Sequence, residues 1–217
     1  GLAPFTAAAL TVVWLWFWRR NRRQALMLTL LLIVVAIVLA PFLFELSGGE
    51  RELEYSWGGR LLLYKMVLDL VKEHPILGLG PAAYRHYGYV QTLSAGVVGG
   101  ALWVQPKINS HNNYIDIYAQ QGLVGLGLFL WFVVELGLVG WRLTTRFWGD
   151  FSEGYVHGAL GGLAGSLVAM MLVDWFLPFV YNVGFAGFRT SALAWMFLGG
   201  LVALEQKSQL EKQASGQ

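Results

Sequence analysis

The stretch NSHNNYIDIYAQQGLVG, residues 109–125, places polar side chains directly before a long apolar run. His111 is its one histidine, Asn112 follows, and Asp116 lies further along. A histidine can take a proton from a substrate hydroxyl near neutral pH. The same pattern also fits a polar helix cap at a membrane interface, where histidine and asparagine side chains satisfy backbone amides. The local pattern alone leaves both interpretations open.

Arginines upstream of this stretch offer a second kind of chemistry. Arg60 opens the amphipathic part of GGRLLLYKMVLDLVKEHP, and a guanidinium can bind a phosphate or diphosphate through two parallel hydrogen bonds. Arg85 lies in YRHYGY, where tyrosines such as Tyr84 could stack on a sugar. Arginines and tyrosines also contact lipid head groups at membrane surfaces, so anchoring remains the alternative for each of them.

Other charged positions have structural explanations. Asp174 and Arg189 flank a short connection between apolar runs, and an ion pair between them is favoured over catalysis. Glu135 lies near the end of a run, where water or a partner helix can satisfy it. The sequence contains no Walker loop, no H-E-x-x-H and no metal-spaced histidine pair. We therefore predict neither a metal nor a cofactor.

The composition indicates a membrane protein. Of 217 residues, 56% are hydrophobic and 13% are charged, about half the usual charged share. The basic pI near 8.9 owes much to the cluster RRNRR between two apolar runs, which is a topology signal, and no nucleic-acid partner is predicted. The absence of cysteine excludes disulfides and thiolate metal sites.

Five apolar runs approach or exceed the roughly 20 residues that a bilayer requires, namely residues 2–18, 25–46, 122–141, 158–180 and 183–204. The last two are predicted to form a tight hairpin around Tyr181. Basic residues follow the first and third runs and recur in the tail, at Arg19, Arg20, Arg22, Arg23, Arg142, Arg146, Lys207 and Lys212. The positive-inside rule places these segments in the cytoplasm, and an odd number of spans then puts the N-terminus outside.

The predicted fold class is therefore all-α and polytopic, in four parts. Residues 1–46 hold two transmembrane helices and a basic turn, and 47–110 form a large extracytoplasmic loop. Residues 111–204 hold three further spans, and the polar tail 205–217 is expected to fray.

The loop itself is predicted to contain an amphipathic helix. Its polar stripe recurs at helical spacing and is made of Lys65, Asp69, Lys72 and Glu73. Pro75 ends it, and its apolar face is predicted to lie on the membrane surface or against the bundle. Beyond the loop, Gly122, Gly125 and Gly127 would allow a neighbouring helix or a lipid chain to approach closely.

Together these residues resemble a known family. Arg60 with LLLYKMVLDLVKEHPILGLGP, followed by SHNNYIDIYAQQGLVGLGLFL, is similar to the O-antigen ligase-related family of bacterial membrane proteins, which also contains polysaccharide polymerases and protein O-oligosaccharyltransferases. The most specific part is His, Asn, nine residues and Gly-x-x-Gly, joined to the upstream arginine and HPILGLGP. The likeness runs from the first span to the last.

Two features depart from the family pattern. Members usually have about a dozen spans and a Ser-Arg-Gly element just before the helix that here begins GLAPF, and this sequence has neither. Leu126 also stands where a small residue often follows the second glycine. We therefore expect the sequence to correspond to the C-terminal part of such a protein, with an N-terminal half or other membrane subunits as partners.

The resemblance implies a GT-C-like, metal-independent glycosyltransferase in the bacterial inner membrane, with its large loop in the periplasm. It would transfer a glycan from an undecaprenyl-diphosphate donor to a glycan, lipid or protein acceptor. By the same resemblance, His111 would be the base or orienting group for the acceptor hydroxyl, and Arg60 would stabilise the departing diphosphate. Arg85, Asn112 and Tyr84 are the predicted substrate-binding residues.

Two other classes remain open. A non-catalytic membrane subunit, or a remnant of the family packed in a larger complex, is favoured by ten tryptophans and by many small residues in the last three runs. A transporter would need a polar path through the bilayer, which Glu135, Asp174 and Arg189 form only if they converge. The ligase interpretation predicts that Arg60 and His111 face one cavity above the bilayer.

Overall fold

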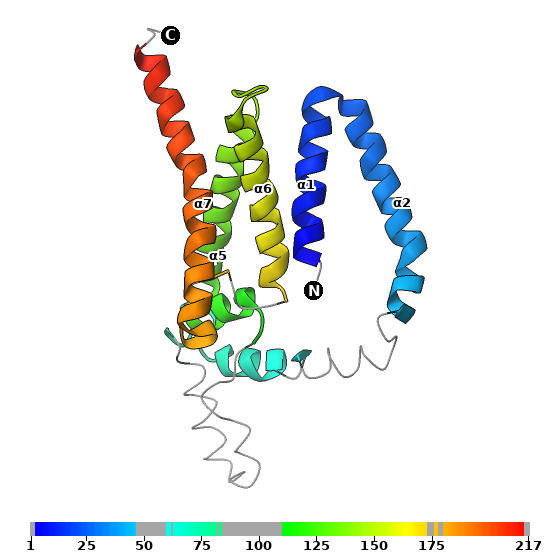
Figure 1. The fold of residues 1–217 in the computed structure, drawn as a ribbon. Helices are drawn as coiled ribbons and strands as arrows, with labels where there is room; N and C mark the ends of the chain where they lie inside the picture. The colour runs from blue at the N-terminus through cyan, green and yellow to red at the C-terminus, as the bar shows by residue number, and fades with distance from the viewer. Residues whose placement is uncertain are drawn as a thin grey trace, which may run out of the picture. The chain divides into compact units, whose positions relative to one another are not determined.

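The protein is all-helical in the part that the computed structural model describes, which is residues 3–46, 60–61, 63–81, 83, 110–172, 176–177 and 180–214. Five long helices are present: α1 (Ala3–Arg20), α2 (Arg22–Leu46), α5 (Asn113–Leu143), α6 (Phe151–Met170) and α7 (Val180–Ala214) (Figure 1). A shorter helical segment, residues 60–61 and 63–71 (segment 60–71 below), precedes α5, and no strand occurs among the described residues. The all-helical prediction is confirmed.

Three helices are long and apolar enough to cross a bilayer. The candidate spans are Arg22–Phe42 within α2, Asn113–Leu143 in α5 and Gly187–Ala214 within α7. The chain is therefore a membrane protein, as its composition predicted. α1 ends in two arginines and α6 is rich in glycine and polar residues, and neither belongs to this set. The count of five spans stays a prediction.

The chain divides into two compact units. Unit 1 consists of Gly1–Val38, Trp131–Ala169 and Arg189–Gln217, and unit 2 consists of Leu39–Leu130 and Met170–Phe188. Unit 1 holds α1, α6 and most of α7. Unit 2 holds segment 60–71 and the beginning of α5, and therefore both Arg60 and His111.

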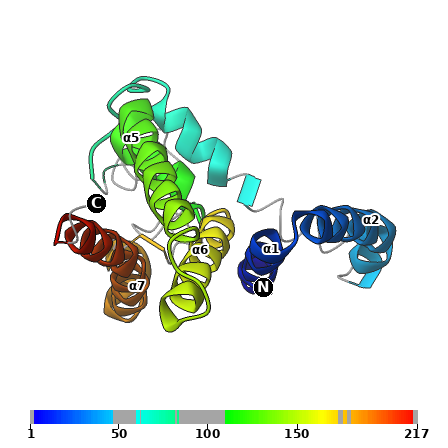
Figure 2. The same ribbon diagram turned by 90° about the horizontal axis from the view of Figure 1, so that it is seen from above.

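Glycines bring the helices of unit 1 into close contact. In Figure 2, α6 lies between α1 and α7. A Cβ atom added to Gly161 would lie 2.8 Å from the carbonyl oxygen of Ala8, and one added to Gly165 would lie 2.6 Å from that of Pro4. Small residues at helix interfaces permit such backbone approach, so α1 and α6 depend on these positions.

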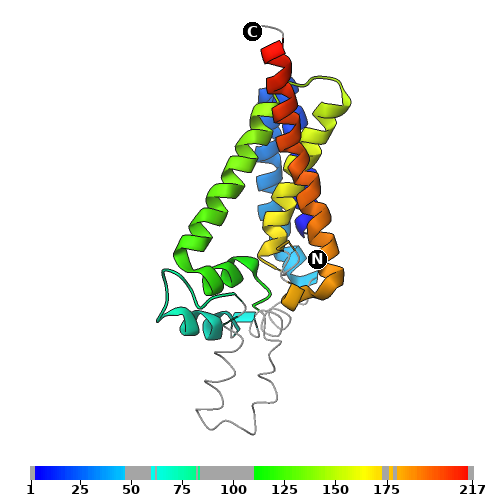
Figure 3. The same cartoon turned by 90° about the vertical axis from the view of Figure 1, so that its left-hand side faces the viewer.

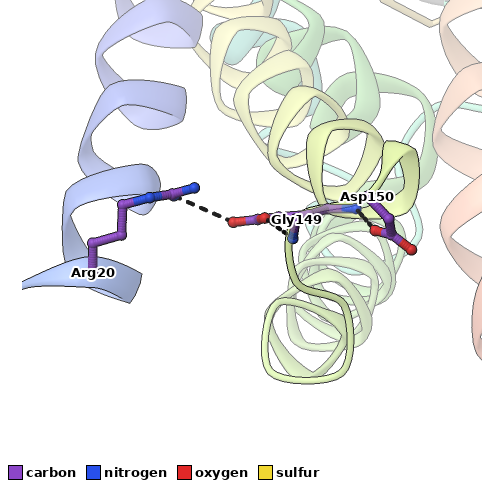
Figure 4. A network of polar contacts seen from close by, with 4 residues as sticks. Arg20, Gly149 and Asp150 are labelled. Atoms are coloured by element: carbon purple, nitrogen blue, oxygen red, sulfur yellow. Dashed lines mark hydrogen bonds and ion pairs between the residues drawn. The ribbon is translucent and has the colours of Figure 1, made fainter.

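A polar network joins the end of α1 to the start of α6 (Figure 4). The guanidinium of Arg20 lies 3.3 Å from the Glu153 carboxylate, which also accepts a 2.6 Å hydrogen bond from the backbone N–H of Gly149. Asp150 caps α6, because its carboxylate accepts a hydrogen bond of 2.9 Å from the Glu153 N–H. The basic turn therefore also joins the end of α1 to the start of α6.

The other basic positions meet α7 at the same end of unit 1. Arg142 at the end of α5 lies 3.5 Å from Glu205, and Arg146 donates a 3.1 Å hydrogen bond to Ser208. Glu205 and Ser208 are nearly buried. These contacts hold the tail in a helix that continues to Ala214, so the prediction of a frayed tail is wrong for residues 205–214.

The connection before α7 also differs from the prediction. Tyr181, expected in a turn, lies inside α7, which begins at Val180, and α6 already ends at Met170. Pro178 is a helix-start signal in the sequence and precedes Tyr181, which accounts for the earlier start. Asp174 lies outside the described residues, so its pairing with Arg189 stays a prediction. Glu135 is exposed and accepts a 3.2 Å hydrogen bond from the Trp131 indole.

Segment 60–71 is amphipathic, as predicted. Its described polar stripe is exposed, and Val67 and Val71 on the other face are buried. The helix ends at Val71, before Pro75. The Lys72 ammonium hydrogen-bonds Asp69 and lowers the pKa of that carboxyl. The buried face packs on α5 through Ala119, with Ile115 and Tyr118 beside it.

Candidate functional site

Asn112 is the N-cap of α5. Its side-chain oxygen accepts hydrogen bonds from the backbone N–H groups of Tyr114 and Ile115, at 3.0 and 3.3 Å. These N–H groups have no partner inside the helix, so the cap stabilises its first turn. The side-chain nitrogen of Asn112 donates to the carbonyl of Met171 at 3.4 Å. The structure therefore gives Asn112 a structural role, and substrate binding by this residue stays a prediction.

His111 is the residue immediately before this cap. Its φ of 50° makes it the one non-glycine residue with a left-handed backbone in the described chain, and it is exposed. Such a conformation is uncommon for a side chain of this size and persists where neighbouring contacts enforce it. Exposure and enforced geometry fit a residue that is presented to a substrate.

The contacts that enforce this geometry come from both neighbours of His111. Ser110 is fully buried, and its hydroxyl lies 2.9 Å from the Asp116 carboxylate. The Ser110 hydroxyl oxygen also accepts a hydrogen bond of 3.1 Å from the Asn112 N–H. Asp116 is itself fully buried in the first turn of α5, where a carboxylate is favoured by the helix dipole. His111 is thus anchored by Ser110 on one side and by the cap on the other.

A buried polar stripe continues along α5. Asn113, Asp116 and Gln120 follow at helical spacing and are at most 3% exposed. Within the described part of the chain, neither side-chain polar atom of Asn113 has a hydrogen-bond partner, and the same holds for the Tyr64 hydroxyl. A buried polar group without a partner costs free energy, so these groups do not stabilise the fold.

α5 is interrupted at Gly122, which has φ 65° and ψ −163°. Residues 113–121 and 123–143 point in different directions, as Figure 3 shows. Residues 75–80 enter the break, and four backbone hydrogen bonds of 2.9, 3.0, 2.9 and 3.2 Å close it, from Leu79 to Ala119, Gly80 to Gln120, Leu123 to Pro75, and Val124 to Ile76. In an unbroken helix, Leu123 and Val124 would instead donate to Ala119 and Gln120. The loop motif HPILGLGP and the glycine motif therefore form one structural element.

The glycines of the motif have different surroundings. Gly122 is approached by the backbone of Ile76, which belongs to a turn, whereas the prediction was a neighbouring helix or lipid. A Cβ added to Gly125 would clash with the Gln121 side chain of the same helix, and one added to Gly127 would have no atom within 4 Å. Close approach by the backbone of another segment is thus specific to Gly122.

Of the predicted site residues, the structure describes Arg60, His111 and Asn112, all in unit 2. Arg60 begins segment 60–71 and is half-buried. Tyr84 and Arg85 lie outside the described residues, so their roles stay predictions. Among the described residues, no three His, Cys, Asp or Glu side chains gather as a metal ion would require. Sequence reasoning missed the Ser110–Asp116 contact, because a serine and an aspartate six positions apart do not have the spacing of a capping box.

Comparison with known proteins identifies the family. No curated protein and no solved structure matches the chain significantly. A family model described as O-antigen ligase matches residues 2–130, more than half of the chain. The matched range includes Arg60, the HPILGLGP turn, His111 and the glycine break. The chain belongs to the O-antigen ligase family, and membership implies glycan handling of the kind carried out by O-antigen ligases and polymerases.

Proposed function

We propose that this chain contributes the site of a glycan ligase or polymerase at the outer face of the bacterial inner membrane. The donor would be a saccharide on undecaprenyl diphosphate, and the acceptor a hydroxyl of a glycan, lipid or protein. The family match supports glycan handling. The observation that carries the assignment of residues is the packing of segment 60–71 against the start of α5.

That packing follows from the contacts already described. Pro75 pairs with Leu123 and Ile76 with Val124, an offset of 48 positions, whereas Leu79 pairs with Ala119 and Gly80 with Gln120, an offset of 40. Val67 and Val71 share one buried cluster with Ala119. These contacts join segment 60–71 to the first turns of α5. The proposal places the starts of the two segments, Arg60 and His111, at the same end of this pair, so that both side chains serve one site.

In the proposed reaction, the acceptor hydroxyl attacks the anomeric carbon of the donor sugar. A carbon–oxygen bond forms to the acceptor, and the bond between the anomeric carbon and the diphosphate oxygen breaks. His111 takes the hydroxyl proton or orients the hydroxyl. Arg60 stabilises the negative charge of the departing undecaprenyl diphosphate. The proposal thus assigns one residue to each of the two charge changes that this displacement requires.

Glycan transfer in cells that lack their own ligase tests the proposal. Variants of the full-length protein are expressed at equal levels and checked for membrane insertion. His111→Ala is expected to lower transfer by about 10²–10⁴-fold, and Arg60→Ala by about 10²–10³-fold. The controls are His74→Ala and Lys65→Ala, which remove an exposed histidine and an exposed cation from the same unit. Transfer that is equal in the site variants and the controls contradicts the assignment.

The surface of α2 favours a second candidate function, a structural subunit of a membrane complex. Only 6% of its apolar span is buried. Lipid or partner helices must cover such a face. This candidate requires that the wild-type chain supports no transfer and is purified at fixed stoichiometry with a second membrane protein. Transfer by the wild-type chain that depends on His111 excludes it.

A further inference from the structure

Unit 1 contains a groove that the proposed transfer reaction does not use. It lies between the start of α6 and the last third of α7 and has a cavity volume of about 300 Å³. Phe151 and Tyr155 line it from α6, and Gly200, Ala203, Leu204 and Lys207 from α7. The groove is therefore almost wholly apolar, with a cation among its lining residues.

The residues that line the groove from α7 share one face of that helix. Gly200, Ala203, Leu204 and Lys207 recur at i, i+3, i+4 and i+7, which places them on one face. Ala203 leaves room there, whereas the space at Gly200 is taken by the Tyr155 hydroxyl, so the tyrosine ring bounds the groove at that end. The Tyr155 ring packs at a tilt against the Phe197 ring, with 4.9 Å between the centroids, and its hydroxyl donates to the Phe197 carbonyl. Because its polar tip is already bonded, Tyr155 presents an apolar surface to the groove.

Lys207 stands where α7 changes from apolar to charged residues. The preceding turn ends at Leu204, and Glu205, Lys207 and Glu211 follow. A lysine at such a position can extend its stem along apolar surface and place its ammonium among lipid head groups. Lys207 lies 3.9 Å from Glu211, but both side chains are more than 60% exposed, and an exposed pair of this kind is weak. The ammonium thus remains available to an anion.

We propose that this groove binds an anionic phospholipid, with one acyl chain between the start of α6 at Phe151 and the Ala203–Leu204 face of α7 and the phosphate at Lys207. The cavity is at the lower end of ligand-pocket volumes, about 300–1,000 Å³, and a helix about 10 Å wide is too large for it. Arg142 and Arg146 contact Glu205 and Ser208 on another face of α7, so Lys207 is the cation that lines the groove. A lysine beside apolar surface near head groups favours anionic lipids.

Native mass spectrometry of the full-length protein tests this site with phosphatidylglycerol and phosphatidylethanolamine as probes. The wild type is expected to retain phosphatidylglycerol about fivefold more than phosphatidylethanolamine, the effect of one basic residue at an anionic lipid. Lys207→Gln is expected to abolish this preference. Lys212→Gln, one to two turns further along α7 and outside the groove, is expected to preserve it.

A second variant separates the apolar part of the site from its charge. Ala203→Phe fills the groove and is expected to lower the retention of both lipids, while thermal unfolding and helical circular dichroism report that the protein remains folded. Equal retention of the two lipids by the wild type would overturn the proposal. Equal loss in Lys207→Gln and Lys212→Gln would overturn it too, because both lysines would then act only through net charge.

Discussion

Gly78 and Gly122 lie so close together that a side chain on either one would collide with the backbone of the other. A Cβ on Gly78 would lie 2.5 Å from the carbonyl carbon of Gln120, and one on Gly122 would lie 2.6 Å from the backbone nitrogen of Gly78. Both glycines also have positive φ, at 71° and 65°. The mutual requirement explains why the turn after segment 60–71 and the break in α5 contain glycine together.

Replacing Gly122 by alanine is therefore expected to destabilise the protein strongly. The backbone conformation alone costs about 1–3 kcal/mol for a non-glycine residue, and the clash with the Ile76 carbonyl adds to it. Gly127→Ala is the matched control on the same helix. It meets open space and should be neutral or stabilising by up to about 1 kcal/mol. Equal thermal unfolding midpoints for the two variants in one detergent would contradict the role of the break.

The two asparagines after His111 are expected to respond in opposite ways. Asn112→Ala removes the cap of α5 and should lower the free energy of unfolding by about 1 kcal/mol. Asn113→Leu replaces a buried amide that has no hydrogen-bond partner by an apolar side chain of similar size, and should leave stability unchanged or raise it. Denaturant titration measures both changes. A large loss of stability in Asn113→Leu would show that the amide has a stabilising partner.

Glu153 is expected to be the most sensitive carboxylate in unit 1. It is 5% exposed and connects Arg20 with the Gly149 backbone. Glu153→Ala should cost about 1–3 kcal/mol, mainly through the lost hydrogen bond to Gly149, because Arg20 is one-third exposed and solvent weakens its share. Glu211→Ala removes an exposed carboxylate and should change stability by less than about 0.5 kcal/mol. Similar losses in the two variants would show that the network does not stabilise the fold.

Much of this architecture is encoded by local patterns that can be read directly. The amphipathic face with Val67 and Val71, the beginning of an ordered helix near His111 and the basic ends of unit 1 all follow from spacing, capping chemistry and charge. These features depend on neighbours in the sequence or on the membrane, and both can be inferred without coordinates.

Features that depend on contacts between distant segments could not be predicted. The insertion of residues 75–80 into α5 joins positions nearly 50 apart, and the glycines alone suggested only a close approach by some helix or lipid. The tail was predicted to fray from its polarity, because its partners Arg142 and Arg146 lie more than 60 positions earlier. The Ser110–Asp116 contact needed the left-handed turn at His111, which propensity does not reveal.

The most direct test of a shared site is a distance measurement between positions 60 and 111. These 217 residues contain no cysteine, so Arg60→Cys and His111→Cys introduce the only two thiols within them. Packed helix axes lie about 8–10 Å apart, so a thiol cross-linker of about 10 Å should join two helix starts at one end of the pair in native membranes. The control pairs Lys72→Cys with His111→Cys, because Lys72 follows the last helical residue of segment 60–71, at the opposite end from Arg60. Cross-linking of the Arg60 pair and not the Lys72 pair is the predicted result. The reverse result would contradict the single site for Arg60 and His111.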